Sequence, residues 1–171
     1  MIGWSGCPDA TAKSPTVARG WQCALTVPRE LSMRDGKLCQ QPVHEIERMR
    51  GDCVCATGGK TVEEPGRLFD LVVSCEGAKM VELEIRKGVF VRYADGMLTL
   101  DMGDEGYGRD QRSIELSELR DLRVLSDTTM VEIFANGGEA ALTSRTYSPA
   151  VSAMGLHAEG AASMNFYRLV H

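Results

Sequence analysis

The sequence contains no apolar run that approaches the roughly 20 residues needed to cross a bilayer as a helix. It also lacks a cluster of basic residues, because its 19 lysines and arginines are dispersed and the formal net charge is −5 at pH 7. Phosphate backbones are bound by concentrated positive charge, so we expect neither nucleic acid nor a membrane as a partner. Residues 1–8 lack a basic region followed by a long apolar run, which predicts no export signal and a cytoplasmic location.

No cysteine follows residue 75, although the chain has 171 residues. A small secreted scaffold would distribute its disulfides over the whole fold, so we expect free thiols, mostly buried as small apolar side chains. Cys53 and Cys55 have no nearby histidine or second thiol pair that would complete four zinc ligands. We therefore expect no metal site and no cofactor. The six cysteines are Cys7, Cys23, Cys39, Cys53, Cys55 and Cys75.

What the sequence has in abundance is turn signals between short apolar runs. Asp-Gly or Asn-Gly occurs at residues 35–36, 95–96 and 136–137, each time between two candidate strands. Both residues of such a pair readily adopt the positive φ that a tight hairpin turn needs. These positions therefore predict antiparallel hairpins.

The alternation of apolar and polar residues supports the same fold class. Residues 81–86 place Val81, Leu83 and Ile85 on one face, as in a strand with one buried side. Many short antiparallel strands predict an all-β fold, a β-sandwich of two antiparallel sheets. Helix signals are scarce and support one short helix at residues 43–50. Further strands are expected at residues 69–75, 122–125 and 164–169, and Met33 and Met49 are expected to fill the core.

Several ordered blocks resemble glycoside hydrolase family 32. Residues 20–32, GWQCALTVPRELS, resemble the segment that leaves the catalytic propeller of that family and enters its carboxy-terminal sandwich. Residues 35–46, DGKLCQQPVHEI, resemble the following hairpin and helix, and residues 126–138, SDTTMVEIFANGG, resemble the penultimate hairpin. Residues 2–9 are similar to the last propeller strand. The resemblance implies a concanavalin A-like, lectin-like sandwich.

The resemblance also implies a domain organisation and a parent reaction. Residues 1–27 would be a remnant of the last propeller strand with a linker, and residues 28–171 would be the carboxy-terminal β-sandwich module. In the parent enzyme the implied reaction is hydrolysis of a terminal β-fructofuranoside in sucrose, sucrose 6-phosphate or a fructan. The expected cytoplasmic location favours sucrose 6-phosphate. The implied partner is the propeller catalytic domain.

The catalytic motifs of the family are missing from this chain. Its nucleophile lies in Trp-Met-Asn-Asp-Pro-Asn-Gly, its transition-state stabiliser in Arg-Asp-Pro and its acid/base in Glu-Cys, and none of these occurs here. Glu82 and Glu84 lie two apart on one candidate strand, about 7 Å apart at their backbones and facing water. A retaining glycosidase needs two carboxyl groups in a secluded pocket, so no catalytic residue is predicted.

The matching blocks single out two groups of residues, one expected at a domain interface and one expected to stabilise the fold. Tryptophan commonly stacks on sugars, but packing at a domain boundary is the favoured role of Trp4 and Trp21. For Glu132 a hydrogen bond or salt bridge that fixes its strand is favoured over a sugar contact. The candidate domain-interface residues are Trp4, Trp21, Arg29 and Glu30, and the candidate structural residues of the family motif are Asp127, Glu132, Phe134 and Asn136.

Three functions remain open at this point. The favoured one is a non-catalytic module that packs on the propeller and stabilises it. The second is a carbohydrate-binding module for fructans, with a sugar ligand held by an exposed aromatic such as Trp21 or Tyr93. The third is an oligomerisation module, in which an exposed apolar docking face and an unpaired strand at residues 2–7 favour a homodimer.

Overall fold

Tight turns at the predicted positions connect consecutive strands in the computed structural model, which describes residues 1–6, 14–57 and 61–170. Asn136 and Gly137 have φ values of 52° and 62°, and Asp95 and Gly96 have values of 51° and 74°. Positive φ at both central residues gives a turn whose twist matches that of the flanking strands. The Asp-Gly and Asn-Gly pairs therefore set the hairpins.

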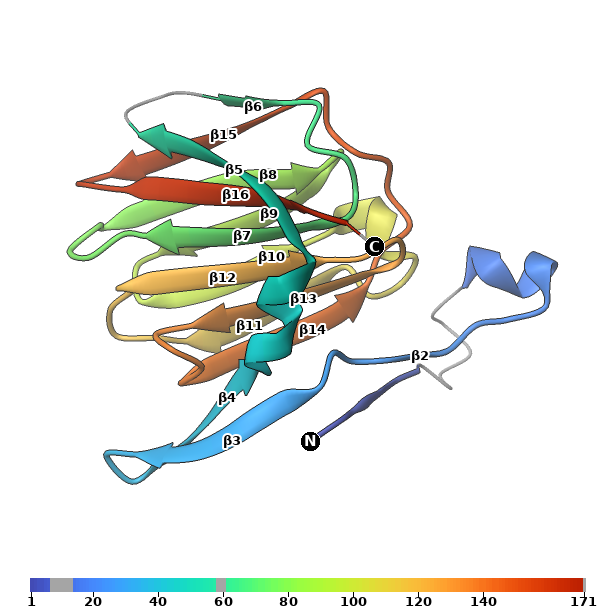
Figure 1. The fold of residues 1–171 in the computed structure, drawn as a ribbon, viewed down its shortest axis with the longest axis horizontal. Helices are drawn as coiled ribbons and strands as arrows, with labels where there is room; N and C mark the ends of the chain where they lie inside the picture. The colour runs from blue at the N-terminus through green and yellow to red at the C-terminus, as the bar shows by residue number, and fades with distance from the viewer. Residues whose placement is uncertain (7–13, 58–60, 171) are drawn as a thin grey trace.

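The strands form two antiparallel sheets of six strands each, which confirms the predicted β-sandwich (Figure 1). The first sheet has, in spatial order, β11 (Gln111–Glu115), β10 (Met97–Asp101), β9 (Val89–Ala94), β8 (Met80–Arg86), β15 (Ala153–Glu159) and β6 (Thr61–Glu63). The second has β14 (Ala140–Arg145), β13 (Met130–Ala135), β12 (Asp121–Ser126), β7 (Phe69–Ser74), β16 (Ser163–Leu169) and β5 (Arg50–Thr57).

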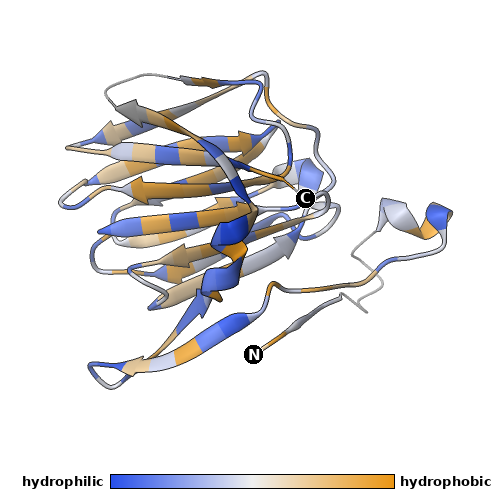
Figure 2. Cartoon of the chain, in the orientation of Figure 1, coloured by the Kyte–Doolittle hydropathy of each residue, from blue (hydrophilic) through white to orange (hydrophobic). Residues whose placement is uncertain are grey.

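The core lies between the two sheets and follows the predicted alternation. Val81, Leu83 and Ile85 are at most 1% exposed and belong to one apolar cluster that both sheets contribute to. Figure 2 shows the apolar residues as orange bands that alternate with blue along the strands. Burial of this shared face is the main favourable contribution to the stability of such a fold.

Residues 1–6 and 14–49 form an arm outside the two large sheets. Strand β1 (Trp4–Ser5) pairs with β2 (Ala24–Leu25), and β3 (Arg29–Arg34) pairs with β4 (Lys37–Pro42), as two separate two-stranded sheets. The pairing of β1 corrects the expectation that this strand is unpaired. The predicted boundary at residue 28 stays a prediction. The remaining elements are the 3-10 helices η1 (Pro15–Arg19), η2 (His44–Met49) and η3 (Gly103–Gly106).

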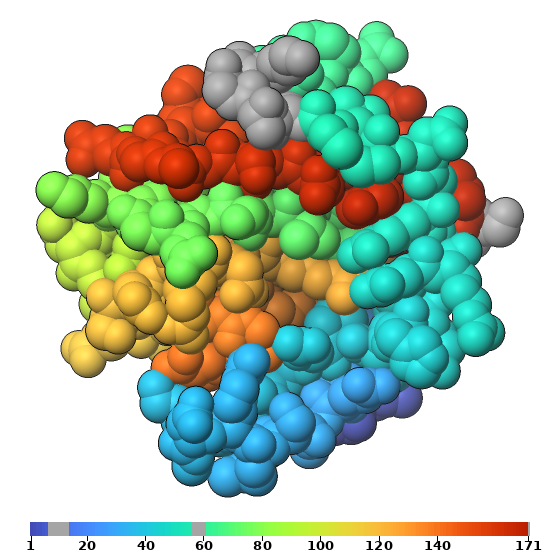
Figure 3. Space-filling view, turned by 60° about the vertical axis from the view of Figure 1, so that its left-hand side comes forward, coloured from blue at the N-terminus to red at the C-terminus, as the bar shows by residue number. Residues whose placement is uncertain are grey.

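Helix η2 coincides with the short helix predicted at residues 43–50, although it is a 3-10 helix. None of the helices in the described part of the chain is both long and apolar enough to span a bilayer. Figure 3 shows η2 and the β3–β4 hairpin in cyan and blue, lying beside the orange strands of the second sheet. The arm therefore covers part of the outer side of that sheet.

Met33 and Met49 do not fill the core, which corrects the prediction. Met33 is 68% exposed, because the β3–β4 hairpin has no second layer over its outer face. Met49 is 36% exposed on η2. The apolar pattern of the arm therefore leads to an exposed apolar surface and not to a second core.

Candidate domain-junction site

A buried ion pair joins the arm to the sandwich. The guanidinium of Arg29 on β3 donates to a carboxylate oxygen of Glu132 on β13, and both residues are nearly inaccessible to solvent, at 7% and 1% exposed. Arg29 also donates to Thr143 Oγ1 at 2.6 Å and to Gln40 Oε1 at 2.9 Å. The other oxygen of Glu132 accepts the backbone N–H of Val27 at 2.7 Å. The pair therefore fixes the arm at several points.

The position of Glu132 follows from strand geometry. On β13, Val131 and Ile133 point into the core, so Glu132 and Phe134 point to the outer side of the sheet. That outer side is covered by the arm, and the Arg29 guanidinium lies 5.0 Å from the centre of the Phe134 ring. A charge that would otherwise face water is thus paired and buried, as burial of a charge requires.

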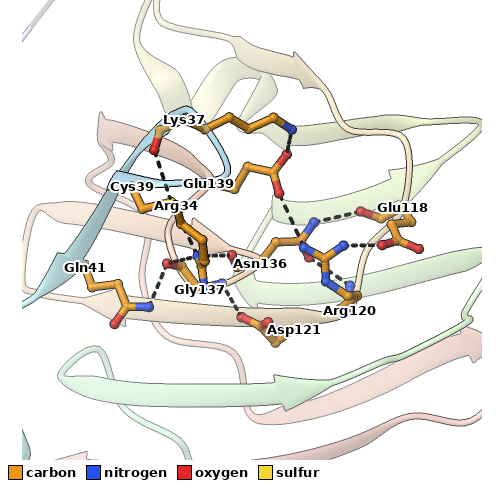
Figure 4. A network of polar contacts seen from close by, with 10 residues as sticks. All are labelled: Arg34, Lys37, Cys39, Gln41, Glu118, Arg120, Asp121, Asn136, Gly137 and Glu139. Atoms are coloured by element: carbon orange, nitrogen blue, oxygen red, sulfur yellow. Dashed lines mark hydrogen bonds and ion pairs between the residues drawn. The ribbon is translucent and has the colours of Figure 1, made fainter. Parts of the chain in front are cut away.

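The tip of the β3–β4 hairpin is held by a second polar network, at the turn between β13 and β14 (Figure 4). Arg34 donates to the carbonyl oxygens of Asn136 and Gly137, both at 2.8 Å, and Gln41 Nε2 donates to the same Gly137 oxygen at 2.6 Å. Lys37 forms an ion pair with Glu139. The hairpin therefore binds the backbone of one turn through several hydrogen-bond donors.

Asn136 connects that turn to the segment before β12. Its side-chain oxygen accepts the N–H of Arg120 and its side-chain nitrogen donates to the carbonyl of Glu118, both at 2.9 Å. The Gly137 N–H donates to Asp121 Oδ1 at 2.8 Å. Both side-chain groups of the amide are thus satisfied, in a residue whose positive φ asparagine tolerates well.

Gly138 allows the hairpin to approach the turn. A Cβ atom at this position would lie 2.0 Å from the carbonyl oxygen of Gln40, and the Gln40 N–H donates to the Gly138 oxygen at 2.9 Å. The backbones of β4 and the β13–β14 turn are therefore in direct contact. Here glycine is required by the space as well as by its φ of 88°.

An apolar cavity of about 310 Å³ opens beside the ion pair. It lies between the arm, through Leu25 and Val27, the helix η2, through Ile46 and Met49, and the second sheet. Glu132 and Asp127 also line it. Both oxygens of Glu132 are already bound, one by Arg29 and one by the backbone N–H of Val27.

The other candidate interface residues lie apart from the ion pair. Trp4 and Trp21 are 60% and 43% exposed, so much of each side chain is left uncovered by this chain. Glu30 is exposed on the opposite side of β3 from Arg29, 3.5 Å from His44 Nδ1. Asp127 is exposed and accepts the N–H of Thr128. The structure thus brings together Arg29, Glu132 and Phe134 but not the tryptophans.

The predicted burial of the cysteines is wrong for three residues. All five described cysteines are free, and Cys39 and Cys75 are buried, but Cys23, Cys53 and Cys55 are exposed. Cys53 and Cys55 project from the edge strand β5 with their sulfur atoms 3.2 Å apart, where no further layer covers them. Cys7 lies outside the described residues.

Two further expectations concern carboxylates and an aromatic residue. Glu82 is partly exposed and pairs with Arg92 at 2.6 Å, and Glu84 accepts the N–H of Gly88, so neither lies in a secluded pocket. Tyr93 is only 5% exposed, which corrects its choice as an exposed sugar-stacking residue. Its side chain points into the core with the other odd-numbered residues of β9.

The described residues also contain one group with the spacing of metal ligands. Glu30, His44 and Glu45 place one ligand atom each within 4.8 Å of one another. All three are exposed, and both glutamates lie within ion-pair distance of His44. Such a cluster is adequately explained by surface ion pairing, which contributes little to stability.

Comparison with known proteins decides the family. The profile described as "Glycosyl hydrolases family 32 C terminal" matches residues 84–169, slightly more than half of the chain. The chain belongs to glycoside hydrolase family 32. The profile described as "Glycosyl hydrolases family 32 N-terminal domain" matches residues 1–42, the region that carries Arg29 and most of the arm. The ion pair between Arg29 and Glu132 therefore joins the regions matched by the two profiles.

Relatives with assigned names support the same assignment. A sucrose-6-phosphate hydrolase of Salmonella typhimurium is 32% identical over 162 residues, which cover 89% of this chain and 32% of that protein. A raffinose invertase of Escherichia coli is 37% identical over 170 residues, covering 89% and 34%. The family 32 chain thus spans about a third of the length of the curated relatives that it matches.

Solved structures share the fold. A sucrose-6-phosphate hydrolase from Lactobacillus gasseri superposes with a TM-score of 0.80 at 22% identity, over 98% of this chain and 38% of that one. A β-fructofuranosidase from Bombyx mori superposes with a TM-score of 0.77 at 19% identity, over 99% and 38%. At these identities the likeness shows the fold alone.

The sequence identified the ion-pair partners individually but not their contact. Gln40 and Thr143 were not singled out, although both bind Arg29. No local pattern marks Gln40 or Thr143. The alternation along each strand indicates only on which face of the strand a side chain lies, and not which residue it contacts. The remaining polar contacts of the junction depend on how the hairpin lies against the sheet.

Proposed function

We propose that this chain is the non-catalytic carboxy-terminal module of a β-fructofuranosidase and that it stabilises the catalytic domain by packing against it. The observation that carries the proposal is the distribution of exposed apolar side chains. Of the fifteen large apolar side chains exposed among the described residues, ten lie in residues 1–49, among them Ile2, Trp4 and Leu25. An exposed apolar surface of this kind is typical of a surface that packs against another protein or domain.

The length of the chain and the names of its relatives support the same proposal. The matched relatives are about three times longer, and they are named for hydrolysis of sucrose 6-phosphate or as an invertase. We therefore propose that the parent enzyme hydrolyses a terminal β-fructofuranoside, with sucrose 6-phosphate as the favoured substrate. A cytoplasmic location belongs to this proposal, and the five free thiols suit a reducing compartment.

The carboxylates at the junction support a structural role. A retaining glycosidase places two free carboxyl groups about 5–5.5 Å apart around the scissile bond. At the apolar cavity, Glu132 is bound on both oxygens and Asp127 is exposed. Neither has the environment of a general acid.

The proposal is tested by adding this chain to the catalytic domain of the Salmonella typhimurium relative, truncated where its match to this chain begins. We expect no hydrolysis of sucrose or sucrose 6-phosphate by the pure chain. We also expect co-elution of the two proteins and a raised melting temperature of the catalytic domain. Leu25→Asp should weaken both effects. Met97→Asp, at an exposed apolar residue of the other sheet, is the matched control.

Turnover by the pure chain that is equal in independent preparations would show that the module is catalytic. A catalytic domain that neither binds the chain nor gains stability from it would overturn the packing role. Light scattering of the chain alone separates this outcome from self-association, because a homodimer formed through the arm would also respond to Leu25→Asp.

A further inference from the structure

Two exposed thiols lie side by side on β5, the edge strand of the second sheet (Figure 1). Cys53 and Cys55 are both exposed, and their sulfur atoms are 3.2 Å apart. Residues two apart on a strand point to the same side, and these two lie opposite Tyr167 and Asn165 on β16. Arg29 of the arm binds β13 and β14, at the other edge of this sheet. The thiol pair is therefore separate from the junction described above.

The spacing of the two cysteines along the strand does not suit a disulfide bond. A strand rises about 3.3 Å per residue, so residues two apart are separated by about 7 Å at their backbones. A disulfide requires Cβ atoms only about 3.5–4.5 Å apart and a sulfur–sulfur bond of about 2.05 Å. Closing such a bond between Cys53 and Cys55 would require the edge strand to bend.

A single atom that bonds to both sulfurs fits the observed separation without any bend. If each bond is about 2.3 Å long, as between zinc and a thiolate, sulfur atoms 3.2 Å apart enclose an angle of about 90° at the bridging atom. A linear ion such as Cu(I) needs the two sulfurs on opposite sides of it. Trivalent arsenic forms three bonds in a pyramid with angles near a right angle, so its geometry matches the pair.

The number of available ligands favours the same element. A structural zinc site requires four protein ligands. In residues 1–6, 14–57 and 61–170, no third cysteine and no histidine or carboxylate places a ligand atom within 4.8 Å of both sulfurs. Two thiols with an open third position are sufficient for arsenic, which is soft and prefers sulfur ligands as soft metals do.

The neighbouring side chains hold the two sulfurs in contact. A hydrogen bond with Cys53 is the largest cause that raises the pKa of Cys55, and it is also the largest cause that raises the pKa of Tyr167. The Tyr167 ring is itself held by the Arg50 guanidinium, which lies 4.4 Å from the ring centre. Cys53 and Cys55 therefore act as one arranged pair and not as two independent surface thiols.

We propose that Cys53 and Cys55 form a capture site for trivalent arsenic, as arsenite or an organic arsenical. In arsenous acid, the two sulfurs displace two of the three hydroxyl groups on arsenic. Two arsenic–sulfur bonds replace two arsenic–oxygen bonds, and the two thiol protons leave with the displaced hydroxyl groups as two molecules of water. Arsenic stays trivalent and keeps its third hydroxyl group on the solvent side, where both residues are exposed. The site depends neither on the arm nor on the proposed packing role.

The test is intact-mass spectrometry of the full 171-residue chain, reduced and then treated with an equimolar amount of phenylarsine oxide. Each molecule of this probe forms two arsenic–sulfur bonds and releases one molecule of water. We expect one adduct per chain. Because both bonds go to one protein, a monothiol such as glutathione should leave the adduct intact, whereas the same concentration of dithiothreitol should remove it.

Substitutions assign the adduct to the pair. Cys53→Ser and Cys55→Ser should each lower the capture of the probe by at least about tenfold, because a single thiol forms only one bond. Cys23→Ser is the matched control, since Cys23 is also an exposed, free cysteine, and it should leave capture unchanged.

A further variant tests the strand geometry itself. Val54 lies opposite the core residue Phe166 and so faces the other side of β5. Val54→Cys combined with Cys55→Ser keeps the number of thiols but places the two cysteines on opposite faces. We expect the same loss of capture as in Cys55→Ser, with circular dichroism confirming that the variant is folded.

The proposal is overturned if the unsubstituted chain forms no adduct, or if the adduct persists in a double variant with Cys53→Ser and Cys55→Ser. Loss of the adduct in Cys23→Ser would place the arsenic elsewhere. Undiminished capture by the variant with Val54→Cys and Cys55→Ser would show that the strand does not select the pair, which also overturns the proposal. All of these results are independent of co-elution with the catalytic domain.

Discussion

Arg29 and Glu132 lie 103 residues apart in the sequence and form an ion pair that is almost wholly buried. Arg29 belongs to the arm, in the part matched by the amino-terminal family profile, and Glu132 to the sandwich. The pair therefore couples the position of the arm to the second sheet. The arm needs such a connection to the sandwich, because two-stranded ribbons are marginally stable alone.

The first prediction concerns this pair. Glu132→Gln leaves the Arg29 guanidinium buried without its counter-charge, and we expect a loss of about 3 kcal/mol in the free energy of unfolding. Glu30→Gln, at the exposed neighbour of Arg29 on β3, should change stability by no more than about 0.5 kcal/mol. Chemical denaturation measures both. A double variant, Arg29→Met with Glu132→Met, should recover part of the loss, and equal stability of the single and double variants would contradict the charge-based explanation.

The second prediction concerns the close approach at Gly138. Gly138→Ala places a methyl group against the Gln40 carbonyl, so the β3–β4 hairpin must move away from the turn. Gly36→Ala is the control, because Gly36 has a similar φ of 76° and open space around its Cβ position. We expect Gly36→Ala to cost about 1 kcal/mol through backbone strain and Gly138→Ala to cost clearly more. Faster amide exchange of β3 and β4 in Gly138→Ala only would show that the hairpin has moved.

The third prediction compares a buried with an exposed ion pair. Asp70 is fully buried and binds both Arg50 and Arg123, whereas Asp101 is 38% exposed and binds Arg92. Asp70→Asn removes the shared counter-charge of two arginines, and we expect a loss of about 3 kcal/mol. Asp101→Asn should cost less than about 1 kcal/mol, because its charge is screened by solvent. Thermal or chemical unfolding of both variants measures the two losses in the free energy of unfolding. Similar losses for Asp70→Asn and Asp101→Asn would contradict the importance of burial.

The fourth prediction follows from the Cys75 thiol. Burial, with a smaller contribution from the charge of Asp121, raises the pKa of Cys75 from its usual value to about 12. Above about pH 9 the unfolded chain releases this proton while the folded chain keeps it, so stability falls as the pH rises from 9 toward 12. Below pH 9 both states hold the proton and the effect vanishes.

The measurement for Cys75 is the free energy of unfolding between pH 8 and pH 11, compared with Cys75→Ala. The variant lacks the thiol, so its stability should fall less steeply over this range, even though it starts lower because of the cavity left behind. Other groups titrate there in both proteins and cancel in the comparison. Parallel curves would mean that Cys75 titrates normally in the folded chain.

Local patterns in the sequence were sufficient for the sandwich itself. Turn pairs such as Asn136 with Gly137 require positive φ, and alternation over residues 81–86 defines a buried face whatever lies opposite. The same patterns failed for Met33, since alternation shows that one face is apolar but not whether another layer covers it. For Glu132 the alternation predicts a side chain on the outer, exposed face of its strand. The arm covers that face, so Glu132 is buried.

The sequence by itself determined the fold class, the hairpin turns and the membership of family 32, because these depend on residues that are close along the chain or on ordered motifs. Only the tertiary structure decided which distant side chains meet. Trp21 and Tyr147 share a cavity although more than a hundred residues separate them, and Arg29 reaches Glu132 over a similar separation. Such contacts depend on how the arm crosses the sheet, and this crossing leaves no periodic signal in the sequence.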